Sequence, residues 1–161
     1  MRAGALPPAL VSVALGLALA FAPRRVWPLS LLAFAVTATT FTIAPVPQGW
    51  LNCAFLGCWI SVAASAAIVH LPNGLHPRAA FALSLNDGFW SGAVIALAGS
   101  RLDLLKALPC VLVLFPATLI VDLRARIAVK VVSSWLIAIA ILAATLQFLP
   151  VTAGYLPDHL D

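Results

Sequence analysis

Long apolar stretches separated by short polar segments are the dominant pattern along the chain. A transmembrane helix needs about 20 consecutive, mostly apolar residues to cross the hydrocarbon core of a bilayer. Six stretches of about this length follow one another, and each is bounded by charged, proline-containing or turn-forming residues. They cover approximately residues 5–22, 26–46, 51–71, 79–98, 104–121 and 127–149. The pattern predicts an all-α polytopic membrane bundle of about six transmembrane helices, with residues 1–161 forming a single transmembrane domain.

The composition also indicates a membrane protein. Hydrophobic residues make up 63% of the chain and charged residues 9%, and the mean hydropathy is +1.10. Soluble domains are typically about half apolar and about a quarter charged, so this chain has too few polar side chains to cover a soluble surface. The net charge of +4 does not indicate nucleic-acid binding, because the basic residues occur singly or in pairs rather than in a stripe.

Most of the 12 prolines fall at or beside the ends of the predicted helices, where a missing N–H group is tolerated. Pro116 lies inside the fifth stretch, and it predicts a kink there. The run Pro72-Asn73-Gly74 predicts a turn after the third stretch. The three cysteines have neither metal-ligand nor redox spacing, and we interpret them as packing residues: Cys53, Cys58 and Cys110.

The first apolar stretch has a second interpretation. Arg2, an apolar run and Ala20-Phe21-Ala22 together resemble a secretory signal with its cleavage site. However, Pro23 would follow the cut, which makes an awkward peptidase substrate, and the basic segment is a single arginine. We therefore favour a transmembrane helix, whereas cleavage of residues 1–22 would leave five spans.

The charged residues between the stretches indicate an orientation through the positive-inside rule. One side carries five arginines, with Lys130 just inside the membrane. The other side carries Arg2, Arg101, Lys106 and the acidic tail 158–161. The richer side is expected to face the cytoplasm, by a small margin, and it comprises Arg24, Arg25, Arg78, Arg124 and Arg126.

Two halves of the chain show faint similarity. A shift of 76 residues places Arg25 on Arg101 and Trp59 on Trp135. Halves of three spans each are inverted relative to one another, and inverted repeats are a recurring transporter architecture. Chance similarity between apolar helices explains the same alignment, so a 3+3 inverted repeat is one of two interpretations.

The least expected feature is a polar run in the fourth stretch, at residues 84–91. Asp87 follows Arg78 by nine residues, which corresponds to roughly 13 Å of helix and places it near the bilayer centre. An aspartate there costs about 2.5–3.5 kcal/mol to insert, and it needs a partner, a wet cavity or a bound proton. Asp87 is therefore the leading candidate for a functional residue.

Helical spacing adds neighbours to this candidate site. Ser84, Asp87 and Ser91 share one helical face, and Trp90 is expected to wall the same cavity. The turn-forming run Asn86-Asp87-Gly88 predicts a helix break that exposes backbone groups. The candidate substrate- or ion-binding residues are therefore Asp87, Asn86, Ser84, Ser91 and Trp90. Two alternatives stay open, namely a plain helix–helix contact and a segment that does not cross the membrane.

Lys130 lies within the last predicted span, and it is a candidate charge partner for Asp87; snorkelling to the interface is the alternative. His70 and His76 have no nearby Cys, Asp or Glu, so no metal site is expected. The chain has no glutamate and no Walker A, G-x-S-x-G or dinucleotide motif. We therefore expect no catalytic residues, no enzymatic activity and no cofactor.

These observations favour a small transporter or channel-like protein that uses Asp87 as a proton- or cation-responsive acid. The alternative is a non-catalytic structural or accessory subunit of a larger membrane complex, which the short loops favour. The excess of Arg over Lys, with Ala and Leu dominant, predicts a bacterial inner membrane. The expected partners are bilayer lipids and either further copies of the chain or other membrane subunits, without nucleic acid.

Overall fold

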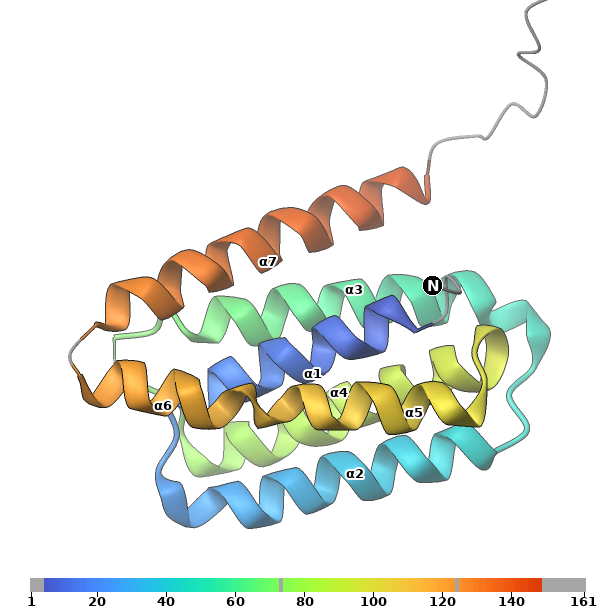
Figure 1. Cartoon of the computed structure of the whole chain (residues 1–161). Helices are drawn as coiled ribbons and strands as arrows, with labels where there is room; N and C mark the ends of the chain where they lie inside the picture. Colours follow the sequence, from blue (N-terminus) through green and yellow to red (C-terminus); the bar gives the residue numbers. More distant parts are fainter. Residues whose placement is uncertain (1–4, 73, 124, 149–161) are drawn as a thin grey trace, which may run out of the picture.

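A computed structural model describes residues 5–72, 74–123 and 125–148. Every regular element within these ranges is helical, which confirms the predicted all-α bundle. Predictions that involve Arg2, Arg124 and the acidic tail fall outside the described residues. The elements are α1 (Leu6–Leu19), η1 (Arg24–Val26), α2 (Trp27–Ile43), η2 (Gln48–Trp50), α3 (Leu51–Ile68), α4 (Pro77–Ala98), α5 (Arg101–Ala107), η3 (Leu108–Val113), α6 (Leu114–Asp122) and α7 (Arg126–Leu146) (Figure 1).

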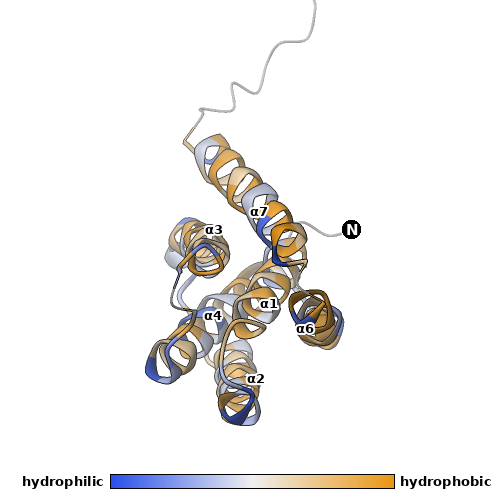
Figure 2. Ribbon diagram, turned by 90° about the vertical axis from the view of Figure 1, so that its left-hand side faces the viewer, coloured by the Kyte–Doolittle hydropathy of each residue, from blue (hydrophilic) through white to orange (hydrophobic). Residues whose placement is uncertain are grey.

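Five helical segments of the described chain are long and apolar enough to cross a membrane. Hydrophobic residues dominate their ribbons in Figure 2. The chain is thus a multi-pass membrane protein, and α1 is its shorter sixth apolar helix of 14 residues. The five segments are Arg24–Ile43, Gln48–Ile68, Pro77–Ala98, Arg101–Asp122 and Arg126–Leu146.

The short helix α1 lies at the centre of the bundle. It contacts α3, α4 and the η3 segment, and ten of its 14 residues are buried. A Cβ atom at Gly16 would lie 2.7 Å from the carbonyl oxygen of Val111, so the two backbones touch. The first apolar stretch is therefore an integral part of the packed core.

The fifth apolar stretch is an interrupted helix rather than a regular one. Its α-helical parts, α5 and α6, are joined by the six-residue 3-10 segment η3. The sequence predicted a kink at Pro116; the interruption that the structure shows is the 3-10 segment Leu108–Val113, which ends three residues before this proline. Pro116 occupies the first turn of α6, where a missing N–H group costs no intrahelical hydrogen bond.

Helices α2 and α4 pack with their backbones close together. A Cβ atom at Gly88 would lie 2.7 Å from the carbonyl oxygen of Phe34, and one at Gly92 would lie 2.6 Å from that of Ala38. Two glycines four residues apart allow this approach, as small-residue interfaces do in membrane helices. α4 is continuous through Asn86-Asp87-Gly88, so the predicted helix break is wrong. The close contact with α2 stabilises the helix and outweighs the local turn propensity.

Helix α7 lies at the periphery. It diverges from the other helices toward its C-terminal end in both Figure 1 and Figure 2. It packs mainly on α3, and only four of its 21 residues are buried. These form a narrow stripe along one face: Val129, Ser133, Leu136 and Ala140.

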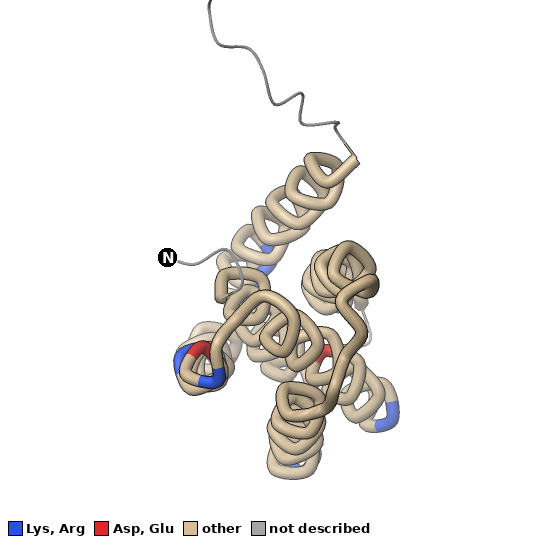
Figure 3. The backbone as a smooth tube through the Cα atoms, turned by 90° about the vertical axis from the view of Figure 1, so that its right-hand side faces the viewer, with Lys and Arg blue, Asp and Glu red and all other residues tan. Residues whose placement is uncertain are grey.

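Charged side chains are sparse on the described chain, and most of the tube in Figure 3 carries none. Four arginines lie at the end of the bundle where α1 finishes and α7 begins: Arg24, Arg25, Arg78 and Arg126. Asp122 lies at the same end, and its Oδ2 accepts a hydrogen bond from Arg24 Nη2 at 2.6 Å. The cytoplasmic placement of this end stays a prediction.

Candidate functional site

Asp87 lies at the middle of α4 and is fully buried. About ten residues of helix separate it from each end of α4, which places it roughly 15 Å from either end. A carboxyl group at that depth has no water to solvate it, so its state depends on its protein neighbours.

Each carboxyl oxygen of Asp87 accepts one hydrogen bond from a neutral side chain. Ser65 Oγ, on α3, donates to Asp87 Oδ2 at 2.7 Å. Asn86 Nδ2 donates to Asp87 Oδ1 at 3.2 Å. Within the described residues no basic side chain forms an ion pair with Asp87. Among the described residues, the acid is therefore held by neutral donors, without a compensating positive charge.

Asn86 extends these contacts into a cluster that joins α3 to α4. Its Nδ2 also donates to Ser61 Oγ at 2.7 Å, and its Oδ1 accepts a hydrogen bond from Trp90 Nε1 at 3.1 Å. The polar cluster thus comprises Ser61 and Ser65 from α3 and Asn86, Asp87 and Trp90 from α4. Its groups satisfy one another in a part of the bundle that is otherwise apolar.

Gly57 positions the Trp90 indole within this cluster. A Cβ atom at Gly57 would overlap the indole ring of Trp90, so the ring lies directly on the α3 backbone. Phe89 contacts Trp90 edge-on, with ring centroids 4.8 Å apart. The ring is thereby fixed between α3 and Phe89, with its N–H group directed at Asn86.

The two candidate serines of α4 do not bond to this cluster. Ser84 is buried, and its Oγ donates to the carbonyl oxygen of Ala80 at 2.9 Å. This bond satisfies the hydroxyl within its own helix, as serines in helices commonly do. Ser91 is also buried, and its Oγ has no hydrogen-bond partner within the described chain.

Lys130, the candidate charge partner, lies at one end of the bundle and lines a cavity there together with Arg126. Its backbone carbonyl accepts a hydrogen bond from Ser134 Oγ at 3.0 Å. No ion pair joins Lys130 to Asp87 within the described chain. The structure therefore keeps the buried acid and this lysine in separate sites.

The histidines take part in local contacts. His76 precedes α4, and its Nδ1 accepts a hydrogen bond from the backbone N–H of Arg78 at 3.3 Å. His70 Nε2 lies 3.4 Å from Ser134 Oγ. Across residues 5–72, 74–123 and 125–148, no three His, Cys, Asp or Glu side chains gather as metal ligands would.

Ser61 and Ser65 are the site residues that the sequence analysis missed. They lie four residues apart on α3, so they share one helical face. That spacing of two hydroxyls within an apolar span was an available signal. However, serines in membrane helices commonly bond to their own backbone, and nothing in the pattern pairs α3 with α4.

Comparison with protein-family models, characterised proteins and solved structures finds no match to this chain. The function must therefore be argued from the residues of the site. A carboxyl group, two hydroxyls and an amide oxygen are hard oxygen donors, which suit a proton or a hard cation.

Proposed function

We propose that the protein is a small transporter or channel-like protein in which Asp87 takes up and releases a proton or a small cation. The observation that supports this proposal is a fully buried carboxyl group whose hydrogen-bond partners are all neutral. Such a group is costly as an isolated anion, and it becomes stable when it gains a proton or a cation.

The hydrogen bonds of Asp87 suit a carboxyl group that alternately binds and releases a proton or a cation. Ser65 Oγ is a donor to an ionised Asp87 and can rotate to accept from a protonated one, because hydroxyls both donate and accept. For a bound cation, the hydroxyl oxygens of Ser61 and Ser65 would join the carboxylate as ligands. Transport then requires that Asp87 alternate between this closed arrangement and one that water reaches.

Proteoliposomes that contain the purified full-length chain test the proposal. A pH-sensitive or sodium-sensitive dye inside the vesicles would report flux under an imposed gradient. Asp87→Asn keeps the shape of the side chain and an oxygen for Ser65, and it is expected to reduce flux to the level of protein-free vesicles.

Asp122→Asn is the matched control, because Asp122 is an exposed acid at the end of α6. It is expected to leave flux unchanged. Unaltered flux in the Asp87→Asn protein, with normal helix content and elution volume, would contradict the proposal. So would a wild-type chain whose proton and sodium fluxes equal those of empty vesicles.

A second candidate function is a structural or accessory subunit of a membrane complex. It is supported by the mutual hydrogen bonding of the cluster, which is also what a helix–helix contact requires. Co-purification with other membrane subunits in mild detergent is the expected outcome for that role. A monodisperse homo-oligomer with coupled flux would instead support the transporter, which we expect to be oligomeric.

For either role, we propose the bacterial inner membrane as the location, on the basis of the Arg-, Ala- and Leu-rich composition. Expression with a fluorescent fusion followed by membrane fractionation would test it. Recovery in the outer-membrane fraction would contradict this part of the proposal.

A further inference from the structure

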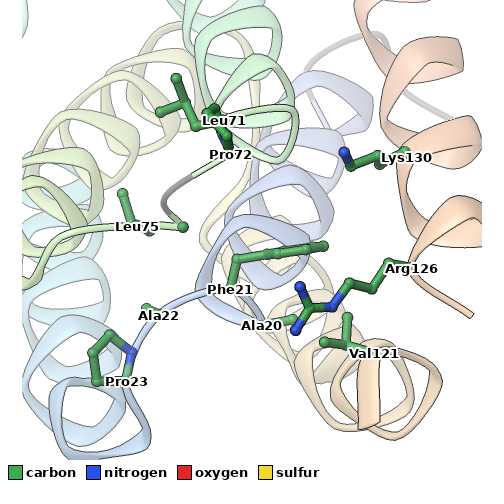
Figure 4. A pocket seen from close by; sticks show the side chains of 11 residues that line it. Ala20, Phe21, Ala22, Pro23, Leu71, Pro72, Leu75, Val121, Arg126 and Lys130 are labelled. Carbon is green, nitrogen blue, oxygen red and sulfur yellow. The ribbon is translucent and has the colours of Figure 1, made fainter. Parts of the chain in front are cut away.

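A cavity of about 490 Å³ opens at the end of the bundle where α1 finishes and α7 begins. Figure 4 shows its walls, which come from the segment that follows α1, the segment between α3 and α4, the end of α6 and the first turns of α7. Most of its lining residues are apolar, for example Phe21, Leu71 and Val121. It is separate from the polar cluster of Asp87.

Two cationic side chains enter this cavity from the same helix. Arg126 and Lys130 lie one turn apart on α7, and both side chains extend from that helix into the cavity in Figure 4, that of Arg126 toward Phe21. No acidic residue lines the cavity, and neither cation forms an ion pair within the described residues. Among the described residues, the cavity therefore presents two positive charges without an acidic partner.

The nearest described acid at this end of the bundle is already engaged. Asp122 ends α6, and its carboxylate bonds to Arg24 at 2.6 Å, on the wall of a different pocket. The helix dipole of α7 adds to the positive potential, since Arg126 is its first residue and Ala125 has no side-chain cap. No acid of the described residues neutralises this cavity, so its charge suits an anionic ligand.

A second, apolar groove is distinct from the cavity but is lined by neighbouring residues of α6 and α7. It has a volume of about 180 Å³, and α1, α7 and the η3–α6 segment line it. Several of its residues are sequence neighbours of cavity residues: Ile120 precedes Val121, and Ala128 lies between Arg126 and Lys130. The lining of the groove includes Leu17, Pro116, Ile120, Ala128 and Val132. A ligand held in both would place a charge near the membrane surface and an apolar chain within the hydrocarbon region.

We propose that the cavity and groove together bind an anionic phospholipid, with the phosphate between Arg126 and Lys130 and an acyl chain along the groove. Basic pockets between transmembrane helices are suited to anionic headgroups. The apolar groove distinguishes a phospholipid from a soluble anion, which would use only the cavity. The lipid also joins α7 to α1 and α6 at the end where α7 starts.

Titration of the detergent-purified full-length chain with phosphatidylglycerol, followed by native mass spectrometry, would test this proposal. Arg126→Gln with Lys130→Met removes both charges from exposed or half-buried positions, so folding should persist. At about a fivefold effect per charge, the double variant should bind this lipid about 25-fold more weakly. Arg126→Lys is expected to retain binding, because it keeps the charge.

Arg78→Gln is the matched control, because it removes an exposed charge at the same end but outside the cavity. It is expected to leave binding unchanged. Ala128→Phe should fill the groove and weaken the binding of long-chain phosphatidylglycerol more than that of its dihexanoyl form. Two comparison ligands complete the test. Phosphatidylcholine is a zwitterionic lipid, and inorganic phosphate is a soluble anion.

Equal binding of phosphatidylglycerol by the wild-type chain and the double variant would overturn the proposal. Full displacement of the lipid by millimolar inorganic phosphate, together with no effect of Ala128→Phe, would also overturn it and assign the cavity to a soluble anion. The proposal would be supported if the wild-type chain prefers phosphatidylglycerol to phosphatidylcholine. The double variant and Ala128→Phe should both lose this preference.

Discussion

Helices α1 and α7 are both strongly apolar, yet they occupy opposite environments. Ten of the 14 residues of α1 are buried, whereas four of the 21 residues of α7 are. Trp135 and Leu142 of α7 are 71% and 62% exposed, while Leu15 of α1 is fully buried. Lipid tails are as apolar as a protein core, so hydropathy alone cannot tell a core helix from a lipid-facing one.

A glycine at a close backbone contact distinguishes α1 from α7, which contains no glycine. α1 carries small residues at its contacts, including Ala14, Gly16 and Ala18, and neighbouring backbones come close to it. α7 exposes large side chains, which suit contact with lipid. Close packing, rather than apolarity, therefore makes α1 the centre of the bundle. The following substitutions test this contrast.

The largest difference is expected between Leu15→Ala in α1 and Leu142→Ala in α7. Leu15 is fully buried, so its truncation removes contacts and leaves a cavity, at a cost of about 2–5 kcal/mol. Leu142 is 62% exposed, and its truncation should change stability by less than about 0.5 kcal/mol. Unfolding by SDS in mixed micelles, followed by circular dichroism, measures both. Equal losses of stability in the two variants would contradict the proposed difference between α1 and α7.

The next effect concerns the close approach of η3 to α1. In Gly16→Ala the new Cβ atom would lie 2.7 Å from the Val111 carbonyl oxygen. The backbones must then separate, at a cost of about 1–3 kcal/mol. Gly49→Ala is the control, because no atom lies within 4 Å of the added Cβ there. Thermal unfolding in detergent should show a lower midpoint for Gly16→Ala alone; an unchanged midpoint would mean that α1 does not depend on this contact.

A smaller difference in stability is expected between Ser65→Ala in α3 and Ser134→Ala in α7, because the two serines differ in burial. Ser65→Ala removes the hydrogen bond to Asp87, and interhelical hydrogen bonds in membranes contribute about 0.6 kcal/mol on average, with a maximum near 1.7. Ser134 lies on the exposed face of α7. The stability change of Ser134→Ala, measured by SDS unfolding in mixed micelles, should therefore lie within experimental error. A larger loss for Ser134→Ala would show that α7 is covered by another protein surface.

The smallest effect is expected for Asp122→Asn, which breaks the ion pair with Arg24. Both side chains are more than half exposed, and exposed pairs contribute about 0–1 kcal/mol. The difference between this variant and the wild type should shrink further at high salt. A loss above that range, independent of salt, would indicate that this end of the bundle is buried in an assembly.

Much of the candidate site was accessible from the sequence. The cost of burying Asp87 made it a candidate, and the structure joins it to Asn86, which in turn bonds to Trp90. Ser84 bonds to its own helix instead. The partners Ser61 and Ser65 were missed because they come from another helix, and the pairing of α3 with α4 is decided by three-dimensional packing.

The sequence by itself determined that the chain is a membrane bundle and that one acid lies deep within it, because the cost of exposing polar groups to lipid acts on each span separately. The tertiary structure decided which helix is central, why α4 does not break at Gly88, and which neighbours hold Asp87. It also separated Lys130 from Asp87 and placed it with Arg126. These outcomes depend on contacts between helices, where lipid and protein are equally apolar and only shape and hydrogen bonding discriminate.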